Sequence, residues 1–313
     1  MMQEKIGNVT LDLFWYPGND RYSDGPVEDM LLDIARNTQE EDLNRVIAEK
    51  KDWSVLYHFS EIRQNIISWL PINRYDHVLE IGSGCGAITG ALCNMAGAVT
   101  GIELSKKRST INAYRNRDKD NLRLIVGNFL DIEPNLTENY DYITLIGVFE
   151  YAEGYMGEIK PYQKMLECAY RHLAPGGKLV IAIENKLGLK YFAGCTEDHI
   201  GVQFKGIEGY PEPAGVRTFS RKELKDMIEG TGYAKTTFYY PYPDYKFPMT
   251  IYSDRYLPKP GEIRESFLNY DRQRILLFSE PLAYNSVIEA GLYQEFANSF
   301  LVIAEKAEKE AGK

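Results

Sequence analysis

The stretch YDHVLEIGSGCGAITG, residues 75–90, decides the fold of this chain. The residues VLEI at 78–81 favour a buried strand, and the glycines that follow, Gly82, Gly84, Gly86 and Gly90, favour a tight turn into a helix. Because glycine has no Cβ, the backbone of such a turn can approach a ligand closely. The stretch therefore predicts a strand, a glycine-rich binding loop and a helix.

The bulk composition limits the class of protein. The chain has 313 residues, of which 44% are hydrophobic and 26% charged, enough for one large domain or a core with substantial additions. A net charge of −9 disfavours a general nucleic-acid binder. The cysteines form no C-x-x-C pair and are expected to be reduced thiols: Cys85, Cys93, Cys168 and Cys195. The N-terminus lacks a signal-peptide pattern and no apolar run reaches about 18 residues, so we expect a cytoplasmic protein without a membrane span.

Strand and helix patterns alternate through the middle of the chain. Apolar strand-like runs lie at 77–82, 98–103, 122–126, 142–147 and 178–184, with helical patterns between them. Short apolar strands separated by helices predict parallel βαβ units in a doubly wound α/β sheet. Two further strands are expected at 233–241 and 299–306, and helices at 27–50 and 53–70.

The remaining segments predict additions to this core. We expect a helical N-terminal lid over 1–74, a core over 75–241 with a substrate-side loop at 186–217, and an inserted cap over 242–298 that is helical at 263–268 and 271–278. The closing strand and tail occupy 299–313. Ser220 and Glu223 predict a capping box at the start of a helix. The additions are expected at the carboxyl ends of the strands, where open α/β sheets bind ligands.

The glycine loop admits two interpretations. Its residues 82–87 fit the dinucleotide pattern G-x-G-x-x-G/A, and Glu103 follows about 20 residues later. Glu80, just before the glycines, favours the other ligand class, S-adenosylmethionine, because a carboxylate accepts a hydrogen bond from an α-ammonium group and repels a phosphate. The PGG turn and strand within 171–185 also favour it. NAD stays open as the alternative.

Five segments resemble one family when taken in order. They are VLEIGSGCG (78–86), GIEL (101–104), VGNFLDI (126–132), YDYITLIGVFEY (140–151) and LAPGGKLVIAIEN (173–185). This set resembles the class I S-adenosylmethionine-dependent methyltransferases. The resemblance implies a Rossmann-like seven-stranded sheet whose last strand is antiparallel, with S-adenosylmethionine as methyl donor and S-adenosylhomocysteine as product.

The resemblance also implies roles by position for residues that follow the strands. The methionine part of the donor is expected against Glu80, Gly82, Ser83, Gly84, Cys85 and Gly86, and the ribose hydroxyls against Glu103 and Leu104. The adenine is expected between Asn128 and Phe129, although core packing is an equal interpretation of Phe129. The pocket floor is expected at Gly147, Val148 and Phe149. Tyr57 and Arg63 are hypothesised to hold the methionine carboxylate.

The acceptor is suggested by what surrounds the core. The place after the fourth strand reads GVFEY, not the N/D-P-P-Y/F common in base-amino methylation, and no basic stripe with interleaved aromatics is present. The additions are rich in tyrosine and acids, which suits a polyhydroxylated acceptor, while simple packing of an irregular lid explains the same composition. A nucleic-acid acceptor is therefore disfavoured.

A narrower resemblance involves the added segments. YHFSEIRQNIISWLPI (57–72), IENKLGLKYFAG (183–194), VRTFS (216–220) and YPYPDYKFP (240–248) resemble methyltransferase domains of bacterial surface-polysaccharide biosynthesis systems. Such domains occur alone or fused to glycosyltransferases or kinases. This resemblance implies O-methylation of a sugar or glycan-linked group, with a separate glycosyltransferase as a possible partner.

A hydroxyl acceptor also requires removal of its proton, and a histidine is the usual base. We favour His199, with Glu184, Glu197 or Asp198 as orienters, while a packing role for His199 stays open. Substrate contacts are expected at Tyr151, Glu184, Asn185 and Tyr245. No feature demands a metal, although carboxylates of the additions could bind a divalent ion. Two other functions stay open: an NAD-dependent sugar-modifying enzyme, and a non-catalytic S-adenosylmethionine-binding partner of a glycosyltransferase.

Overall fold

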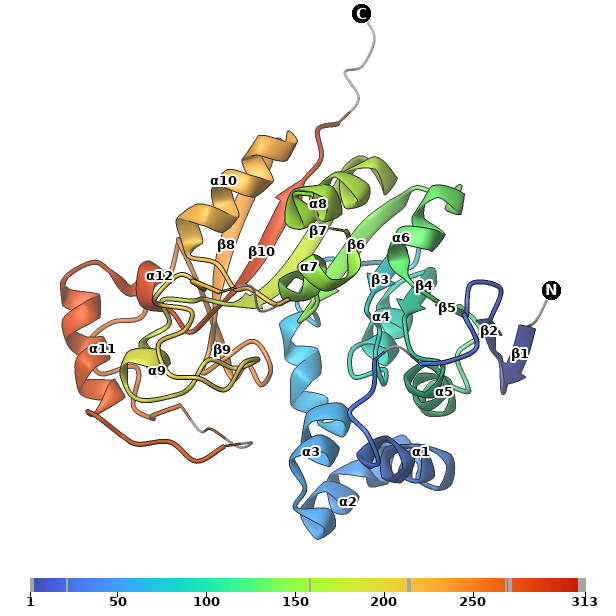
Figure 1. Ribbon diagram of the computed structural model, residues 1–313, viewed down its shortest axis with the longest axis horizontal. Coiled ribbons are helices and arrows are strands. Elements are labelled where there is room, and N and C mark those ends of the chain that lie inside the picture. The colour runs from blue at the N-terminus through green and yellow to red at the C-terminus, as the bar shows by residue number, and fades with distance from the viewer. Residues whose placement is uncertain are drawn as a thin grey trace, which may run out of the picture. The chain divides into compact units, whose positions relative to one another are not determined.

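The computed structural model describes residues 3–20, 22–157, 159–212, 215–267, 269 and 272–308. Figure 1 shows the helices and strands, coloured by residue number. The chain divides into two compact units. The first comprises Met1–Leu145, Arg171–Lys178 and Glu308–Lys313, and the second comprises Ile146–Tyr170 and Leu179–Ala307. No helix in the described ranges is both long enough and apolar enough to cross a membrane.

The first unit contains a mostly parallel sheet in the order β1-β2-β5-β4-β3-β6. Its strands are β1 (Gln3–Ile6), β2 (Val9–Asp12), β3 (His77–Ile81), β4 (Ala98–Glu103), β5 (Leu122–Val126) and β6 (Tyr140–Ile146, whose last residue falls in the second unit). Only β1 runs antiparallel to its neighbour. After its first residue β3 is buried throughout, as expected for a strand covered on both faces.

Helices of the first unit lie between and before these strands. They are α1 (Val27–Asn37), α2 (Leu43–Lys50), α3 (Trp53–Phe59), α4 (Thr89–Met95), α5 (Lys106–Arg115) and α6 (Phe129–Ile132), with 3-10 turns at Glu40–Asp42, Glu61–Ile66 and Glu133–Asn135. The helix predicted over 53–70 is wrong beyond Phe59, because Ser60 is extended and caps the 3-10 turn that follows. The helix predicted over 27–50 is interrupted between Asn37 and Leu43.

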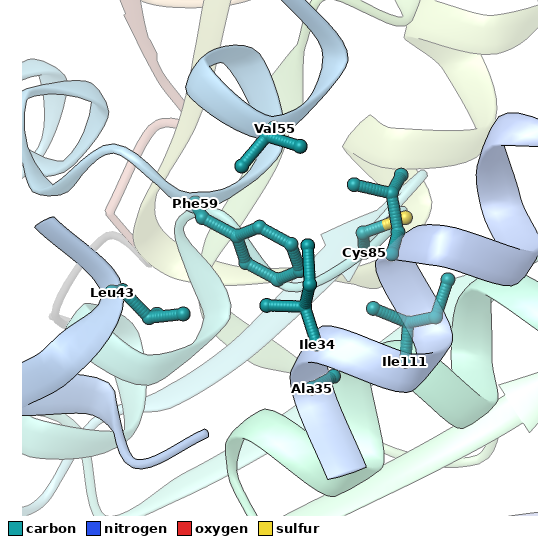
Figure 2. Close-up of a cluster of buried hydrophobic side chains, with 8 residues drawn as sticks. Ile34, Ala35, Leu43, Val55, Phe59, Cys85 and Ile111 are labelled. Atoms are coloured by element: carbon teal, nitrogen blue, oxygen red, sulfur yellow. The ribbon is translucent and has the colours of Figure 1, made fainter. Parts of the chain in front are cut away.

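A buried apolar cluster joins the N-terminal helices to the glycine loop, as Figure 2 shows. Its members come from α1, α2, α3, the loop after β3 and α5: Leu31, Ile34, Ala35, Leu43, Val55, Phe59, Cys85 and Ile111. Phe59 is fully buried there. The side chain of Cys85 therefore serves the packing of the loop, while its backbone belongs to the predicted ligand site.

The second unit contains the strand order β7-β10-β8-β9. These strands are β7 (Leu173–Glu184, which begins in the first unit), β8 (Lys235–Tyr242), β9 (Thr250–Ser253) and β10 (Ser299–Glu305), and β10 and β9 both run antiparallel to β8. Its helices are α7 (Ala152–Tyr155), α8 (Pro161–His172, whose last two residues belong to the first unit), α9 (Leu189–Phe192), α10 (Arg221–Thr231), α11 (Glu280–Glu289) and α12 (Tyr293–Phe296), with a 3-10 turn at Phe149–Tyr151.

The predicted fold class is confirmed. All seven expected strands are present, β3 to β6 are parallel, and the last strand is antiparallel to β8. The capping box of Ser220 and Glu223 at the start of α10 is also confirmed. Three strands were not predicted: β1, β2 and β9, each only four residues long. Such short segments carry too little period-two alternation to be distinguished from loops.

The helices predicted at 263–268 and 271–278 are wrong for the residues that the structure describes there. Residues 263–267 and 272–278 contain no helix, and Leu268 and Asp271 lie outside the described residues. One physical reason is visible at Leu277, whose N–H donates to the Ala193 carbonyl at 3.1 Å, a partner far away in the chain. The next helix, α11, begins only at Glu280.

Truncation of Phe59 tests the apolar cluster. We expect Phe59→Ala to lower the free energy of unfolding by about 3–5 kcal/mol, because it removes a fully buried ring from a packed site. Phe14→Ala is the matched control, since Phe14 is 64% exposed. Urea unfolding followed by circular dichroism measures both. Equal losses in the two variants would contradict the packing described.

Candidate functional site

The loop after β3 has a backbone that only glycine adopts readily. Gly82, Gly84 and Gly86 have φ values of 72°, 52° and 80°. A Cβ on Gly86 would lie 2.6 Å from Oδ1 of Asn112, so no side chain fits there. The predicted tight turn into a helix is present, with α4 beginning at Thr89.

Four N–H groups of this loop donate to acceptors within the protein. Those of Gly82 and Ser83 donate to the Ile102 carbonyl in β4, at 2.8 and 3.1 Å. The N–H of Gly84 donates to the Glu103 carboxylate at 2.9 Å. The N–H of Gly86 donates to the Ser83 carbonyl at 3.0 Å. A dinucleotide pyrophosphate requires free N–H groups at this turn. The hydrogen bonding therefore weighs against the NAD interpretation.

Glu103 ends β4 with a buried carboxylate. Its Oε2 accepts the hydrogen bond from Gly84, and its Oε1 accepts one from the N–H of Ser105 at 2.9 Å. Burial raises the pKa of Glu103, although nearby Arg108 and the two N–H donors oppose this. Each carboxylate oxygen has a second acceptor position, so the group retains the capacity to accept two adjacent ribose hydroxyls. Leu104, its neighbour, is half-buried.

Glu80 lies in a buried polar chain. Its Oε2 accepts a hydrogen bond from Thr89 Oγ1 at 2.6 Å, and that oxygen accepts one from Asn112 Nδ2 at 3.0 Å. Burial raises the pKa of Glu80 to about 8, against the Thr89 hydrogen bond. The carboxyl group is therefore mainly protonated at neutral pH, which weakens the argument that it repels phosphate. An ammonium group beside it would favour the ionised form.

Tyr57 and Arg63 form a stacked pair. The guanidinium carbon of Arg63 lies 3.9 Å from the centre of the Tyr57 ring. Arg63 is only 5% exposed, and within the described residues its Nε and one terminal nitrogen have no hydrogen-bond partner. A buried cation with unused donors is costly without an anionic partner. Arg63 is thus a candidate anion-binding residue of the first unit.

The residues predicted around the adenine lie after β5. Asn128 caps α6 through a hydrogen bond from the Leu130 N–H, and Phe129 is 7% exposed, so both have local structural roles. A Cβ on Gly127 would lie 2.7 Å from the Trp15 Cβ, so the N-terminal segment passes close to this turn.

The contacts of this N-terminal segment with α5 were not predicted from the sequence. Asp20 accepts hydrogen bonds from the N–H groups of Lys106 and Lys107 and from the Ser105 hydroxyl, at 2.7, 3.2 and 2.9 Å. It therefore caps α5 directly after Glu103. An isolated aspartate in a turn-rich segment gives no sequence signal of a contact this distant in the chain.

In the second unit, Gly147 and Tyr245 lie together. A Cβ on Gly147 would lie 2.8 Å from the Tyr245 hydroxyl, and Tyr245 is itself buried. Val148 is half-buried, whereas Phe149 is fully buried and packs on Tyr162 with ring centres 5.5 Å apart. Phe149 thus contributes to an aromatic core.

Ionisable side chains gather in the second unit at the end of β7 and in the segment after it. We name them the polar cluster: Glu150, Glu184, Lys190, Glu197, Asp198, His199, Asp244 and Lys246. Lys190 pairs with Asp244 and Asp198 at 2.7 and 2.9 Å, and Lys246 pairs with Asp198 at 2.9 Å and with Glu184. Charges this deeply buried persist because they are paired.

His199 lies among three carboxylates. Its Nδ1 is 3.0 Å from Glu197 Oε1, and its Nε2 is 3.6 Å from Glu150 Oε1 and 3.8 Å from Glu184 Oε2. Burial opposes the charged form, but Glu184 and the other two carboxylates raise the pKa of His199 well above 6.5. A histidine that already holds its proton cannot accept another, so this environment counts against His199 as the general base.

Of the other residues predicted to contact substrate, Tyr151 lies beside His199, whereas Asn185 has a structural role. The Tyr151 ring meets the His199 ring edge-on, with centres 5.2 Å apart. Asn185 is buried and donates to the carbonyls of Glu295 and Ala297, both at 2.8 Å, so its amide N–H groups serve the fold. The structure therefore brings Glu184, Tyr151 and His199 together. Glu150, Lys190 and Lys246 lie in the same region and were not predicted from the sequence.

The pH dependence of stability tests the environment of Glu80. Between about pH 4.5 and 8 the folded protein keeps the Glu80 proton while the unfolded chain has lost it, so the free energy of unfolding falls as the pH rises. Glu80→Gln still accepts from Thr89 but does not titrate. We expect the variant to gain stability relative to wild type from pH 5.5 to 8, by at most about 1.4 kcal/mol per pH unit. Urea midpoints that shift in parallel would contradict this.

Comparisons with known proteins show similarity to methyltransferases. Residues 79–179 match the family model of a methyltransferase domain. The chain is 38% identical over 100 residues to ribosomal RNA small subunit methyltransferase A of Borrelia garinii, covering 32% of this chain and 36% of that protein. It is 24% identical over 165 residues to the mitochondrial ubiquinone biosynthesis O-methyltransferase of Rattus norvegicus, covering 51% of this chain and 45% of that protein. The chain thus spans less than half of either relative.

Solved structures show weaker similarity. A chain of the complex between the Haloferax volcanii Trm112 methyltransferase activator and a methyltransferase gives a TM-score of 0.48 at 18% identity, covering 88% of this chain and all of that one. A Haemonchus contortus phosphoethanolamine N-methyltransferase with bound S-adenosylhomocysteine gives 0.45 at 15%, covering 79% and 52%. The sequence similarity is confined to part of the chain: residues 79–179 are similar to a methyltransferase domain.

Proposed function

We propose that the protein transfers a methyl group from S-adenosylmethionine to a hydroxyl group of a sugar or glycan-linked acceptor. The observation that supports binding of the methyl donor is the glycine loop, in which four N–H groups donate within the protein while the Glu103 carboxylate lies at the end of β4. Such a loop suits an uncharged ribose and a methionine tail better than a pyrophosphate. The proposal assigns donor binding to the first unit.

Arg63 completes this proposal by binding the methionine carboxylate. The support is its burial and its unused donors within the described residues, together with the stacking on Tyr57 that holds the guanidinium in place. A planar guanidinium matches a carboxylate geometrically. Glu80 would then face the α-ammonium group of the same methionine.

The acceptor part is supported by the chemistry of the second unit. The polar cluster offers carboxylate acceptors and ammonium donors, and tyrosines border it: Tyr191 donates to Asp198 at 2.5 Å and Tyr210 to Glu197 at 3.1 Å. Polyhydroxylated molecules are recognised by such donors and acceptors next to aromatic faces. A cytoplasmic location and a separate glycosyltransferase that makes or extends the acceptor belong to the same proposal.

The reaction is an in-line displacement. The acceptor oxygen forms a bond to the methyl carbon as the bond from carbon to sulfur breaks, and the sulfonium becomes the neutral thioether of S-adenosylhomocysteine. The acceptor hydroxyl gives up its proton. The protein has to align the oxygen with the methyl group and exclude water.

Substitution of Arg63 tests the donor part. We expect Arg63→Met to weaken binding of S-adenosylhomocysteine about 10- to 100-fold, because a charge-assisted hydrogen bond is lost. Binding of 5′-methylthioadenosine, which lacks the amino-acid group, is expected to change little. Calorimetric titration with both ligands separates the two cases, and an equal loss for both would reject a role of Arg63 toward the carboxylate.

Methyl transfer itself tests the acceptor part. Radiolabelled S-adenosylmethionine is incubated with the protein and either nucleotide-sugars and surface-glycan fragments or ribosomal RNA, the substrate class in the name of the Borrelia relative. We expect label in a carbohydrate and at least a tenfold lower rate for Glu103→Gln. Label only in RNA would overturn the sugar assignment. Donor binding without transfer to any acceptor would favour the non-catalytic alternative.

A further inference from the structure

We propose that Glu150, Glu184 and His199 form a binding site for a divalent first-row transition-metal ion such as Mn²⁺. One ligand atom from each of these side chains lies within 4.8 Å of the others. One imidazole nitrogen and two carboxylate oxygens form a mixed ligand set that suits Mn²⁺, Fe²⁺ or Zn²⁺. The three residues come from separate segments: the 3-10 turn after β6, the end of β7 and the segment after α9.

The spacing of the ligand atoms fits an ion between them. His199 Nε2 lies 3.6 Å from Glu150 Oε1 and 3.8 Å from Glu184 Oε2. Neighbouring ligand atoms at about 2.1 Å from an octahedrally coordinated ion such as Mn²⁺ are about 3.0 Å apart. Both pairs are slightly beyond hydrogen-bond distance, and small side-chain rotations bring them to coordination distance.

Two carboxylate oxygens in this trio have unused acceptor capacity. Glu150 and Glu184 are 1% and 0% exposed, and among the described residues Oε2 of each has no hydrogen-bond partner. Glu184 Oε2 is also the atom nearest His199 in its carboxylate, while Glu184 Oε1 is taken by Lys246. A buried carboxylate oxygen without a partner is costly, so these atoms point to a missing cation.

The imidazole is oriented as in protein metal sites. His199 Nδ1 bonds Glu197 Oε1, and Glu197 Oε2 accepts the N–H groups of His199 and Ile200 at 2.8 and 2.6 Å. Tyr210 donates to the same carboxylate. A carboxylate that holds one ring nitrogen fixes the tautomer and directs the other nitrogen to the metal. Here that other nitrogen, Nε2, faces Glu150 and Glu184.

A neighbouring trio provides an internal contrast. Glu184, Asp198 and Asp244 also bring carboxylate oxygens within reach of one ion, but Lys190 and Lys246 pair with all three. The ammonium groups of these two lysines already neutralise the carboxylates of this second trio. Across the polar cluster, five carboxylates face two lysines, an excess of three negative charges before His199 is counted. A divalent ion beside Glu150 would offset most of this excess.

The site gives the cluster a role that rests on the proposed function. An acceptor hydroxyl bound to the ion would lose its proton more readily, since a metal ion lowers the pKa of a coordinated oxygen. Glu150, Glu184 and His199 would hold the ion, and the ion would act as a Lewis acid on the bound oxygen. This assigns positioning and activation of the acceptor to the ion, in place of a histidine base.

The test is binding of Mn²⁺ alone to the full chain after treatment with a chelating resin. We expect one ion per chain with micromolar affinity, and at least tenfold weaker binding for Glu150→Gln and for His199→Gln. Glu229→Gln is the matched control, because Glu229 is an exposed carboxylate in α10 of the same unit. Circular dichroism identifies a variant that fails to fold.

Electron spin-echo spectroscopy of the wild type provides a readout that needs no variant. We expect modulation from one histidine nitrogen on bound Mn²⁺. Affinity no tighter than millimolar, equal losses in Glu150→Gln and Glu229→Gln, or bound Mn²⁺ without a nitrogen signal would each overturn the site. Because S-adenosylhomocysteine binding depends on the first unit, donor binding without Mn²⁺ would refute the metal site alone, and Mn²⁺ without donor binding would refute the proposed function alone.

Discussion

The hydrogen bond from the Gly84 N–H to the Glu103 carboxylate is the interaction on which the proposed binding site of the methyl donor depends. It ties the glycine loop after β3 to the end of β4, and the same carboxylate accepts the N–H of Ser105 at the start of α5. One side chain thus fixes three elements. The arrangement also decides what the loop can bind, because an N–H that donates to a carboxylate is not available to a phosphate, and a carboxylate repels one.

The second unit follows a different constraint, the burial of charge. Lys190 and Glu184 are fully buried, and their ionised forms are tolerable only with partners. Lysine–carboxylate pairs satisfy most of the polar cluster, and the exceptions lie around His199. The carboxylates raise the pKa of His199, which favours a proton on the imidazole ring that we propose as a metal ligand. The same carboxylates weigh against His199 as a base and include those that we propose as ligands of a divalent ion.

The sequence predicted the core well because its strands are strongly apolar and its glycines are specific to a turn. β3, β4 and β5 match their predicted ranges within one residue, and Glu80, Glu103 and Asn128 lie at or just beyond strand ends, as expected. Short edge strands and the irregular segment at 263–278 were not predictable from local patterns, because their backbone partners, such as Ala193 for Leu277, are distant in the chain.

Residues of the candidate site could be predicted together only where they are close in the sequence. Glu197, Asp198 and His199 are consecutive, so the sequence could suggest them together, but nothing in it joined His199 to Glu150. No local pattern indicated that Asp20 caps α5. Arg63 is hypothesised from the sequence to hold the methionine carboxylate, and its burial favours such an anion-binding role. Such pairings depend on tertiary structure, which residue spacing does not encode.

Calorimetric titration of the full chain with S-adenosylhomocysteine and, separately, with NAD tests the central claim most directly. The account predicts micromolar binding of S-adenosylhomocysteine and no measurable binding of NAD, because four N–H groups of the glycine loop already donate within the protein. Binding of NAD alone would contradict it, since the loop would then have to release those hydrogen bonds to a pyrophosphate.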